Sequence, residues 1–319
     1  MLYVDTRWDG NHGIGRFSRE VLSRLDIPWR PLKGSMAPSS PLDVLNPNRL
    51  QLAASDTVFS PGYNAGFSRA RQIITLHDVI HLAISSESGF AKRAYYDRVI
   101  KPAVTKAGIV MTDSETSRTA IESWIGDSRI EVINVGNGCS AAFTRAGPVA
   151  EQFRGAFVYV GNLKPHKNVD VLFQALRLAP SFSLIVVSSD VVDVARRAHK
   201  AGVSSQVVAL SGVTDEKLAE IYRSSRGLLF PSQLEGFGLP AAEALSCGIP
   251  VAYWKGCASV AEIVGEAGPA VSEAKSGQAW ADAMTQMADG TFGPSARSYD
   301  WSDVAQGINA VLHRDRMTS

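Results

Sequence analysis

Two glutamates, Glu235 and Glu243, flank a turn that contains glycine and proline, in the run Glu-Gly-Phe-Gly-Leu-Pro-Ala-Ala-Glu. Pro240 suits the first turn of a helix, where its missing N–H costs nothing, so we expect Glu243 in the opening turn and Glu235 on the loop before it. A helix start offers unpaired N–H groups and the positive end of a dipole, which favour a phosphate. Amides for an anion, beside carboxylates for hydroxyl groups, fit a nucleotide sugar. The alternative is that Glu243 only favours the helix dipole and Glu235 is solvated.

A basic loop lies upstream of this run. It follows an apolar segment at 157–160 with strand character, and it leads into an apolar-periodic helix at 169–178. A strand, a glycine turn, a basic loop and a helix together present cations to a phosphate, and here the candidate cations are Lys164 and Lys167. The alternative for either lysine is an ordinary solvated loop residue.

These segments resemble the retaining glycosyltransferases of glycosyltransferase family 4, which have the two-domain GT-B fold. The resemblance rests on residues 161–168, 229–232 and 235–243, and it continues through 244–251 and 259–268. In the first half of the chain it is carried by three shorter motifs: Gly13-Ile-Gly-Arg-Phe17, Thr75-Leu-His-Asp78 and Thr112-Asp-Ser114. It therefore covers nearly the whole chain.

The resemblance implies a role for each matching residue of the second half. Glu243 would hold the ribose hydroxyls of the donor, Glu235 would contact the donor sugar, and Lys167 would bind the diphosphate. Many relatives have an arginine directly after the strand glycine, where this chain has Asn162. Lys164 is the candidate substitute, although a point-charge lysine does not reproduce a bidentate guanidinium, and both Asn162 and Lys164 are kept as expected donor contacts. Other donor contacts are implied for Gly212 and Val213 at the base, and for Gly236, Phe237, Gly238 and Leu239 at the sugar and phosphates.

In the first half, His77 matches the histidine that reaches the donor sugar beside the reacting carbon. The alternative is a histidine satisfied in the core at a strand end. Gly13 and Gly15 would let a loop backbone approach the donor phosphate or the acceptor, before a helix expected at 15–25. We favour a capping or turn role for Asp78, and Arg16 is either a further anion contact or solvated.

The implied reaction moves a hexose to a lipid-linked or polysaccharide acceptor in surface-glycan synthesis, with GDP-mannose as the best guess for the donor. Retention at the anomeric carbon is inherited from the resemblance. Stabilising charge on the departing nucleoside diphosphate should supply most of the acceleration, through Lys167 and the helix start before Glu243. The sequence has no Asp-x-Asp arrangement suited to Mg²⁺ or Mn²⁺, so we expect neither a metal nor a cofactor.

Composition agrees with this class. A chain of 319 residues exceeds the usual single core, and 45% hydrophobic residues are too many for disorder. The 32 lysines and arginines nearly balance 31 acidic residues, which argues against binding nucleic acid. The three cysteines show no metal spacing and no disulfide framework, and the N-terminus reads as a strand, not as a signal peptide. No apolar run approaches the ~20 residues that span a bilayer, so we expect a cytoplasmic protein.

Strands and helices alternate along the chain, which predicts an α/β protein with parallel sheets and helices on both faces. We expect two Rossmann-like domains facing each other across a cleft: an acceptor-side domain at 1–145 and a nucleotide-sugar-binding domain at 150–300. The break falls in the turn-rich stretch 137–148. Ligands of such sheets bind beyond the carboxyl ends of the strands, where both glutamates, Lys167 and His77 fall. The resemblance implies that a last amphipathic helix, 301–319, packs on the first domain.

Three other functions are consistent with parts of the sequence. A dehydrogenase would use Gly13-Ile-Gly-Arg-Phe-Ser18 as a dinucleotide fingerprint, but the third glycine is missing and the preceding loop is too long. A nucleotide-sugar epimerase or a phosphorylase can share the fold, since fold does not fix reaction. A non-catalytic binding subunit would keep the cleft without the chemistry, and the intact set of Glu235, Glu243, Lys167 and His77 argues against it.

The segment 91–106 bears on the acceptor, because it mixes cations and aromatic residues at helical spacing. It would rest on an anionic membrane where a lipid-linked acceptor waits, at the inner face of the plasma membrane. The alternative is an ordinary solvated helix face.

Overall fold

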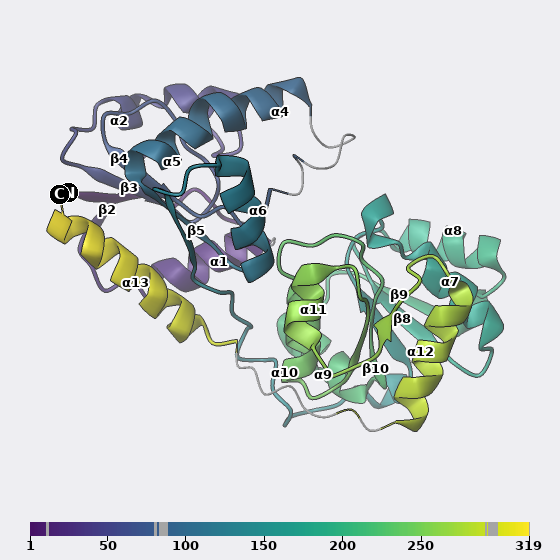
Figure 1. Ribbon diagram of the computed structural model, residues 1–319. Helices are drawn as coiled ribbons and strands as arrows, with labels where there is room; N and C mark the ends of the chain where they lie inside the picture. Colours follow the sequence, from purple (N-terminus) through teal and green to yellow (C-terminus); the bar gives the residue numbers. More distant parts are fainter. Residues whose placement is uncertain (11–12, 80–81, 83–88, 291, 293–298, 319) are drawn as a thin grey trace. The chain divides into compact units, whose positions relative to one another are not determined.

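The computed structural model describes residues 1–10, 13–79, 82, 89–290, 292 and 299–318. The chain divides into two compact units: unit 1 comprises Met1–Gly138 and Asp300–Ser319, and unit 2 comprises Cys139–Tyr299. Each unit is built on parallel strands with helices packed against them (Figure 1). The α/β class with parallel sheets is therefore confirmed.

Unit 1 holds a parallel ladder in the order β2-β1-β3-β4, and a second ladder of β5 with β6. A bridge from Thr75 to Met111 connects the two ladders. Because neighbouring strand residues point to opposite faces, Ile73 packs into one core and Ile74 into the other. The strands are β1 (Leu2–Val4), β2 (Trp29–Pro31), β3 (Thr57–Ser60), β4 (Arg71–Ile74), β5 (Ile109–Thr112) and β6 (Glu131–Asn134).

The helices of unit 1 cover both faces of these strands. Apolar residues of α1 (Gly13–Leu22) and α13 (Trp301–Thr318) fill one core. The second core is filled from α5 (Lys101–Ala107), α6 (Glu115–Ile125) and the π-helical turn η2 (Tyr96–Ile100), which links α5 to α4 (Phe90–Tyr95). Helix α13 is tied to the end of α1 by Asn309 Nδ2, which donates to Arg24 O at 3.0 Å. The short helices η1 (Pro41–Leu45) and α2 (Pro47–Leu50) follow β2.

Unit 2 holds a parallel six-stranded sheet in the order β12-β11-β10-β7-β8-β9. The chain starts at β7, builds outward through β8 and β9, and then returns to build β10, β11 and β12 on the other side. The order of the strands therefore reverses between β7 and β10. The strands are β7 (Phe157–Val160), β8 (Leu184–Val187), β9 (Val207–Leu210), β10 (Gly227–Phe230), β11 (Val251–Trp254) and β12 (Ala270–Val271).

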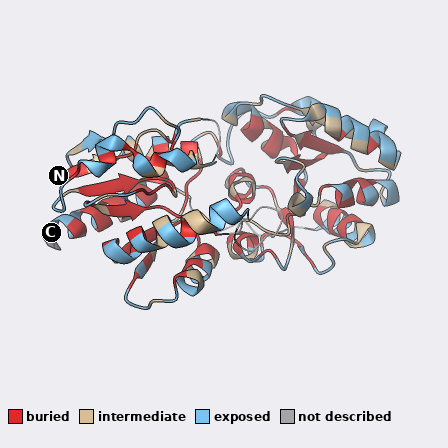
Figure 2. Cartoon of the chain, turned by 90° about the horizontal axis from the view of Figure 1, so that it is seen from above, coloured by how far each residue is buried: buried red, intermediate tan, exposed pale blue. Residues whose placement is uncertain are grey.

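The central strands of unit 2 are buried on both faces, which explains their continuous apolar sequences (Figure 2). Val158 and Leu228 pack on α9 (Asp215–Ser224), α10 (Leu239–Ser246) and α11 (Ala258–Val264). Phe157 and Leu229 pack on α7 (Asp170–Leu178), α8 (Val191–Ala201) and α12 (Gly277–Asp289). Short 3₁₀ turns lie at η3 (Glu151–Phe153), η4 (Pro165–Lys167) and η5 (Ser204–Gln206). No helix within the described ranges combines the length and apolar character needed to cross a membrane.

Candidate functional site

Apart from Gly212 and Val213, the residues singled out in the second half of the sequence lie at or just after the carboxyl ends of β7 and β10. These strands are neighbours, and the chain order reverses between them. Open parallel sheets bind ligands at such a point, because the loops after the two strands diverge and leave a crevice. Here the two loops also contact each other, since the Gln233 N–H donates to His166 O at 2.8 Å.

An ion pair joins the two loops. Lys167 Nζ lies 2.6 Å from Glu235 Oε1, although the residues are 68 positions apart in the sequence. Their side chains are only 18% and 13% exposed, so water and salt screen this pair less than a surface pair. The sequence analysis assigned both residues to one ligand, and the structure brings them into direct contact with each other.

The loop that carries Lys167 is held by its backbone. Gly161 has φ 151°, and a Cβ atom at this position would lie 2.9 Å from Tyr159 Oη, so a larger residue is excluded. The same Tyr159 hydroxyl donates to Asn162 O at 2.6 Å. At the far end of the loop, Asn168 adopts φ 54° and donates its Nδ2 to Ala274 O at 2.6 Å. Lys167 is thereby presented from a restrained turn just before α7.

Asn162 and Lys164 lie earlier in this loop, and both are exposed. Asn162 Oδ1 accepts the backbone N–H of Lys164 at 3.1 Å, which is a local Asx-type turn. The Asn162 side chain is thus used to shape its own loop.

The second loop ends at the N-terminus of α10. Gly238 is the N-cap with φ 111°, and a Cβ atom there would lie 3.1 Å from Val260 Cγ2. Gly238 has no side chain to cap the helix. Pro240 has no N–H, and the Ala241 N–H donates to Gly238 O at 2.9 Å, so the N–H groups that could meet an acceptor are those of Leu239 and of the loop before it. Gly236, Phe237 and Leu239 surround this end, and the Phe237 ring meets Tyr299 edge-on at 5.9 Å. The arrangement suits an anion.

Glu243 lies beyond the opening turn of α10. The expectation that it belongs to the opening turn is wrong, because α10 begins at Leu239, one residue before Pro240, and has no acidic residue in its first turn. Glu243 is only 4% exposed, and its Oε2 accepts the hydroxyl of Tyr222 at 3.3 Å. Burial, and then the Glu243 carboxylate, raise the pKa of Tyr222 well above its usual value. Nothing in the sequence pointed to Tyr222, because its α9 lies outside the motifs.

Gly212 and Val213 follow β9, the edge strand of the sheet. Gly212 adopts φ 64°, which favours glycine, and Thr214 then caps α9. These two residues share the carboxyl edge of the sheet with Lys167 and Glu235, but β8 lies between their strand and β7.

In unit 1, His77 follows β4, and its ring is engaged on both nitrogens. Nδ1 lies 2.8 Å from Asp113 Oδ2, and Nε2 lies 3.0 Å from the carbonyl oxygen of Pro61. The ring also meets Phe17 edge-on, with centroids 4.8 Å apart. The sequence analysis did not assign Asp113 a role, although its place directly after β5 was a usable signal.

Gly13 and Gly15 do not form a loop, so that expectation is wrong. Both belong to the first turn of α1, which begins at Gly13 and ends at Leu22. Gly15 is buried, and a side chain there would collide with the carbonyl group of Gly10. Gly15 therefore permits close packing of the chain that enters the helix.

A buried charged cluster that no sequence motif indicated lies at the carboxyl ends of β1 and β3, where the strand order of unit 1 reverses. Arg7 Nη2 lies 2.6 Å from Asp5 Oδ2, and Arg7 Nη1 lies 2.5 Å from Asp43 Oδ1. Arg49 contacts the same two carboxylates, and Asn64 Nδ2 donates to Asp5 Oδ2 at 2.8 Å. Burial alone would raise the pKa of Asp5, but the hydrogen bonds and charge of Arg7 hold it below its usual value.

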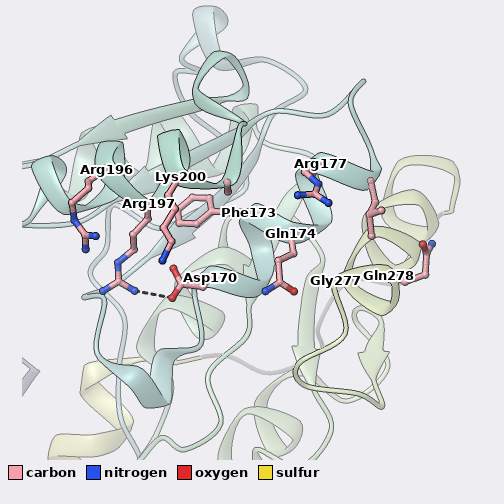
Figure 3. A pocket seen from close by; sticks show the side chains of 11 residues that line it. Asp170, Phe173, Gln174, Arg177, Arg196, Arg197, Lys200, Gly277 and Gln278 are labelled. Carbon is pink, nitrogen blue, oxygen red and sulfur yellow. Dashed lines mark hydrogen bonds and ion pairs between the residues drawn. The ribbon is translucent and has the colours of Figure 1, made fainter.

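A separate pocket of about 800 Å³ lies between α7, α8 and α12 (Figure 3). None of the predicted donor-binding residues lines it. Arg197 connects the pocket wall to the loop of Lys167, because it contacts Asp170 Oδ2 at 3.0 Å and donates to Leu163 O at 3.4 Å. Elsewhere in the described chain, no three His, Cys, Asp or Glu side chains gather as metal ligands, and the three cysteines are buried free thiols.

Residues 148–315 match the family model described as "Glycosyl transferases group 1". The chain belongs to this family. It is 26% identical over 249 residues to the "O-antigen chain mannosyltransferase B" of Escherichia coli, covering 70% of this chain and 64% of that protein. It is 31% identical over 234 residues to the "D-inositol 3-phosphate glycosyltransferase" of Mycobacterium bovis, covering 65% of this chain and 48% of that protein. The chain thus spans less than two thirds of the length of these relatives.

Solved structures of glycosyltransferases show the same fold. The apo form of the lipopolysaccharide outer core galactosyltransferase WaaB matches with a TM-score of 0.67 at 14% identity, covering 98% of this chain and 99% of that chain. WaaG, a glycosyltransferase involved in lipopolysaccharide biosynthesis, matches with a TM-score of 0.64 at 17% identity, covering 99% and 97%. The GT-B fold expected from the sequence is confirmed.

Proposed function

We propose that this protein is a retaining hexosyltransferase that takes its sugar from a nucleoside diphosphate donor, with GDP-mannose as the first candidate. The observation that carries the proposal is the Lys167–Glu235 pair beside the uncapped start of α10, at the strand reversal of unit 2. Mannose is favoured because the Escherichia coli relative is named a mannosyltransferase. The acceptor is a lipid-linked or polysaccharide glycan, by the same analogy.

In this mechanism the donor exchanges the ion pair for two contacts of its own. The diphosphate accepts hydrogen bonds from the Lys167 ammonium and from the backbone N–H groups of the loop that enters α10, and a hydroxyl group of the sugar donates to the Glu235 carboxylate. Charge that develops on the leaving diphosphate is then met by groups already held in place, which is the largest source of acceleration in such reactions. The ion pair keeps both side chains in the site before the donor arrives.

Glu243 serves the nucleoside end of the donor. Its carboxylate is buried beside Tyr222, in a region where a hydrogen bond from a ribose hydroxyl faces little competition from water. Because a carboxylate can accept several hydrogen bonds, the Tyr222 contact and a ribose contact are compatible. No role as a glycosidase acid or nucleophile is proposed for either glutamate.

We also propose that the segment 91–106 contacts an anionic membrane at the cytoplasmic face, where a lipid-linked acceptor would lie. Phe90, at the start of α4, is 86% exposed, and the neighbouring Lys92 and Arg93 are exposed cations. Arg93 Nη2 donates to Leu82 O at 3.2 Å, and Lys101 and Lys106 donate to Trp124 O and Arg69 O. Co-sedimentation with vesicles of phosphatidylglycerol should be lost in Phe90→Asp. Equal sedimentation of this variant and the wild type would contradict the contact.

The donor is tested with a thermal-shift panel of GDP, UDP, ADP and dTDP, because a ligand of the native state raises its melting temperature. We expect GDP to give the largest shift, and no shift with any of the four would overturn the proposal.

The reaction is tested with GDP-mannose and a glycan acceptor. We expect the product to keep the anomeric configuration of the donor, as measured by NMR. Transfer should continue in EDTA and be abolished in Glu235→Ala. Turnover by Glu235→Ala would contradict the role assigned to Glu235. Loss of transfer in EDTA would contradict the proposal that no metal is needed.

A further inference from the structure

The ring of His77 lies between two hydrogen-bond acceptors that come from different strands. On one side its Nε2 lies 3.0 Å from Pro61 O, just after β3. On the other side its Nδ1 lies 2.8 Å from Asp113 Oδ2, just after β5. A carbonyl oxygen can only accept, so the Pro61 contact requires a proton on Nε2.

The contact with Asp113 requires a second proton. Two lone pairs that face each other at this distance in a buried site repel, so one proton must lie between Nδ1 and Oδ2. It belongs either to an imidazolium beside a carboxylate or to a carboxylic acid beside a neutral ring. Either way Nε2 keeps its own proton, and the pair has no net charge.

Asn137 limits how Asp113 can act. Asn137 Nδ2 donates to the same Oδ2 atom at 3.1 Å, while Asn137 Oδ1 accepts the Gly138 N–H at 3.0 Å. The amide is therefore oriented with its donor toward Asp113, and position 113 must present an acceptor there. A carboxyl oxygen satisfies this demand and still shares a proton with His77.

We propose that Asp113 is a positioning residue that holds the proton of His77 on Nε2, the ring atom that would donate to a hydroxyl group of the donor sugar. This role rests on the proposed function. In the structure Pro61 O accepts the Nε2 proton, and a hydroxyl oxygen of the sugar would replace Pro61 O as the acceptor. Phe17 lies against the ring and limits its rotation. The backbone of His77 is held as well, because its carbonyl oxygen accepts the Ser117 hydroxyl at 2.8 Å.

Asp78 is a further charged group near the pair, and its negative charge raises the pKa of both His77 and Asp113. Burial works against an imidazolium, but the hydrogen bond and charge of Asp113, with Pro61 and Asp78, raise the pKa of His77 from its usual value. Burial likewise raises the pKa of Asp113, and His77 and Asn137 offset this only in part. The pair therefore keeps its second proton to a higher pH than a free histidine would. As the pH rises through the raised His77 pKa, one proton leaves. The proton that stays lies between Nδ1 and the Asp113 carboxylate, so the Nε2 contact with Pro61 O opens.

The test is ¹⁵N NMR of histidine-labelled protein, with the resonances of His77 assigned among the six histidines by Gln substitution. In the wild type we expect Nε2 to be protonated at pH 6 and to lose its proton only above the usual histidine range. In Asp113→Asn, Asn137 forces the new amide to offer its oxygen, so the neutral ring must move its proton to Nδ1. The same substitution in an Asn137→Ala background frees the amide to donate, and the Nε2 proton should return.

Transfer kinetics separate this role from a structural one. Asp113→Asn should lower kcat by about 10- to 100-fold, as expected for one lost charge-assisted hydrogen bond, and adding Asn137→Ala should recover part of it. A wild-type His77 whose Nε2 is already unprotonated at pH 6, with its proton on Nδ1 alone, would overturn the proposal even if no variant folds. Unchanged kcat in Asp113→Asn with an altered tautomer would overturn the catalytic part. Neither result bears on nucleotide binding by unit 2, which the thermal-shift panel tests separately.

Discussion

Lys167 and Glu235 neutralise each other across the ends of the two central strands of unit 2, with 2.6 Å between ammonium nitrogen and carboxylate oxygen. The cation proposed to bind the diphosphate therefore forms an ion pair with the carboxylate proposed to bind the sugar. A partly buried ion pair contributes little net stability, because desolvation offsets most of the attraction. Its value here is to keep two long side chains ordered at the site until a donor replaces each partner.

Removing the cation should weaken nucleotide binding. We expect Lys167→Ala to lower the affinity for a nucleoside diphosphate by about 10- to 100-fold, since a hydrogen bond to a charged group contributes ~1.5–3 kcal/mol. Lys164→Ala is the matched control from the same loop, and its effect should be smaller because Lys164 is exposed to solvent. Isothermal titration calorimetry measures both. Equal losses would mean that the loop acts only through its total charge.

The ribose contact can be isolated by a cycle of protein and ligand changes. Glu243→Gln keeps an acceptor for the Tyr222 hydroxyl, so the fold should persist. If Glu243 holds ribose hydroxyls, the wild type should bind a nucleoside diphosphate about tenfold better than its 2′-deoxy form, and the variant should bind both alike. Tyr222→Phe is the control for the neighbouring contact. A preference for the ribose form that survives in Glu243→Gln would contradict the assignment.

The cap of α10 should not tolerate a side chain. Gly238→Ala forces φ 111° on alanine and places its Cβ atom 3.1 Å from Val260 Cγ2, so we expect a loss of about 1–3 kcal/mol in unfolding free energy and weaker nucleotide binding. Gly202→Ala has φ 74° and no atom within 4 Å, so it should lose stability without losing affinity. Chemical denaturation and calorimetry compare the two. Unchanged nucleotide affinity in Gly238→Ala would argue against a phosphate at this helix end.

The buried cluster of unit 1 should be sensitive to loss of one cation. Arg49 is fully buried against Asp5 and Asp43. Arg49→Met therefore leaves Arg7 as the one cation of this cluster for two buried carboxylates. We expect a loss of about 3–5 kcal/mol, as for other broken buried pairs. Arg129→Met removes an exposed arginine from its contact with Asp127 and should leave the denaturation curve unchanged. Similar curves for the two variants would show that the cluster is not stabilising.

Much of this architecture could be predicted because it depends on local sequence. The apolar runs of β7 and β10 must be buried on both faces, and the glycine and lysine residues between β7 and α7 must lie at the carboxyl edge of the sheet. The register of α10 was less predictable. Pro240 fits either of the first two helical positions, and the shift places Glu243 in the second turn, buried against Tyr222.

Contacts between distant segments could not be predicted from one sequence. Each of Lys167, Glu235 and His77 was recognised by its motif, but the partner that each selects depends on three-dimensional packing. The cluster around Arg7 and Arg49 has no motif at all, because its residues come from four separate segments and charged residues are usually expected at the surface. Asp5 at the end of β1 was the one available hint.

The most direct measurement is a crystal structure with the nucleoside diphosphate that gives the largest thermal shift. We expect its diphosphate at the start of α10, its ribose hydroxyls on Glu243, and Lys167 Nζ moved from Glu235 to a phosphate oxygen. A diphosphate bound elsewhere, for example in the pocket between α7, α8 and α12, with the Lys167–Glu235 pair intact, would contradict the donor site proposed here.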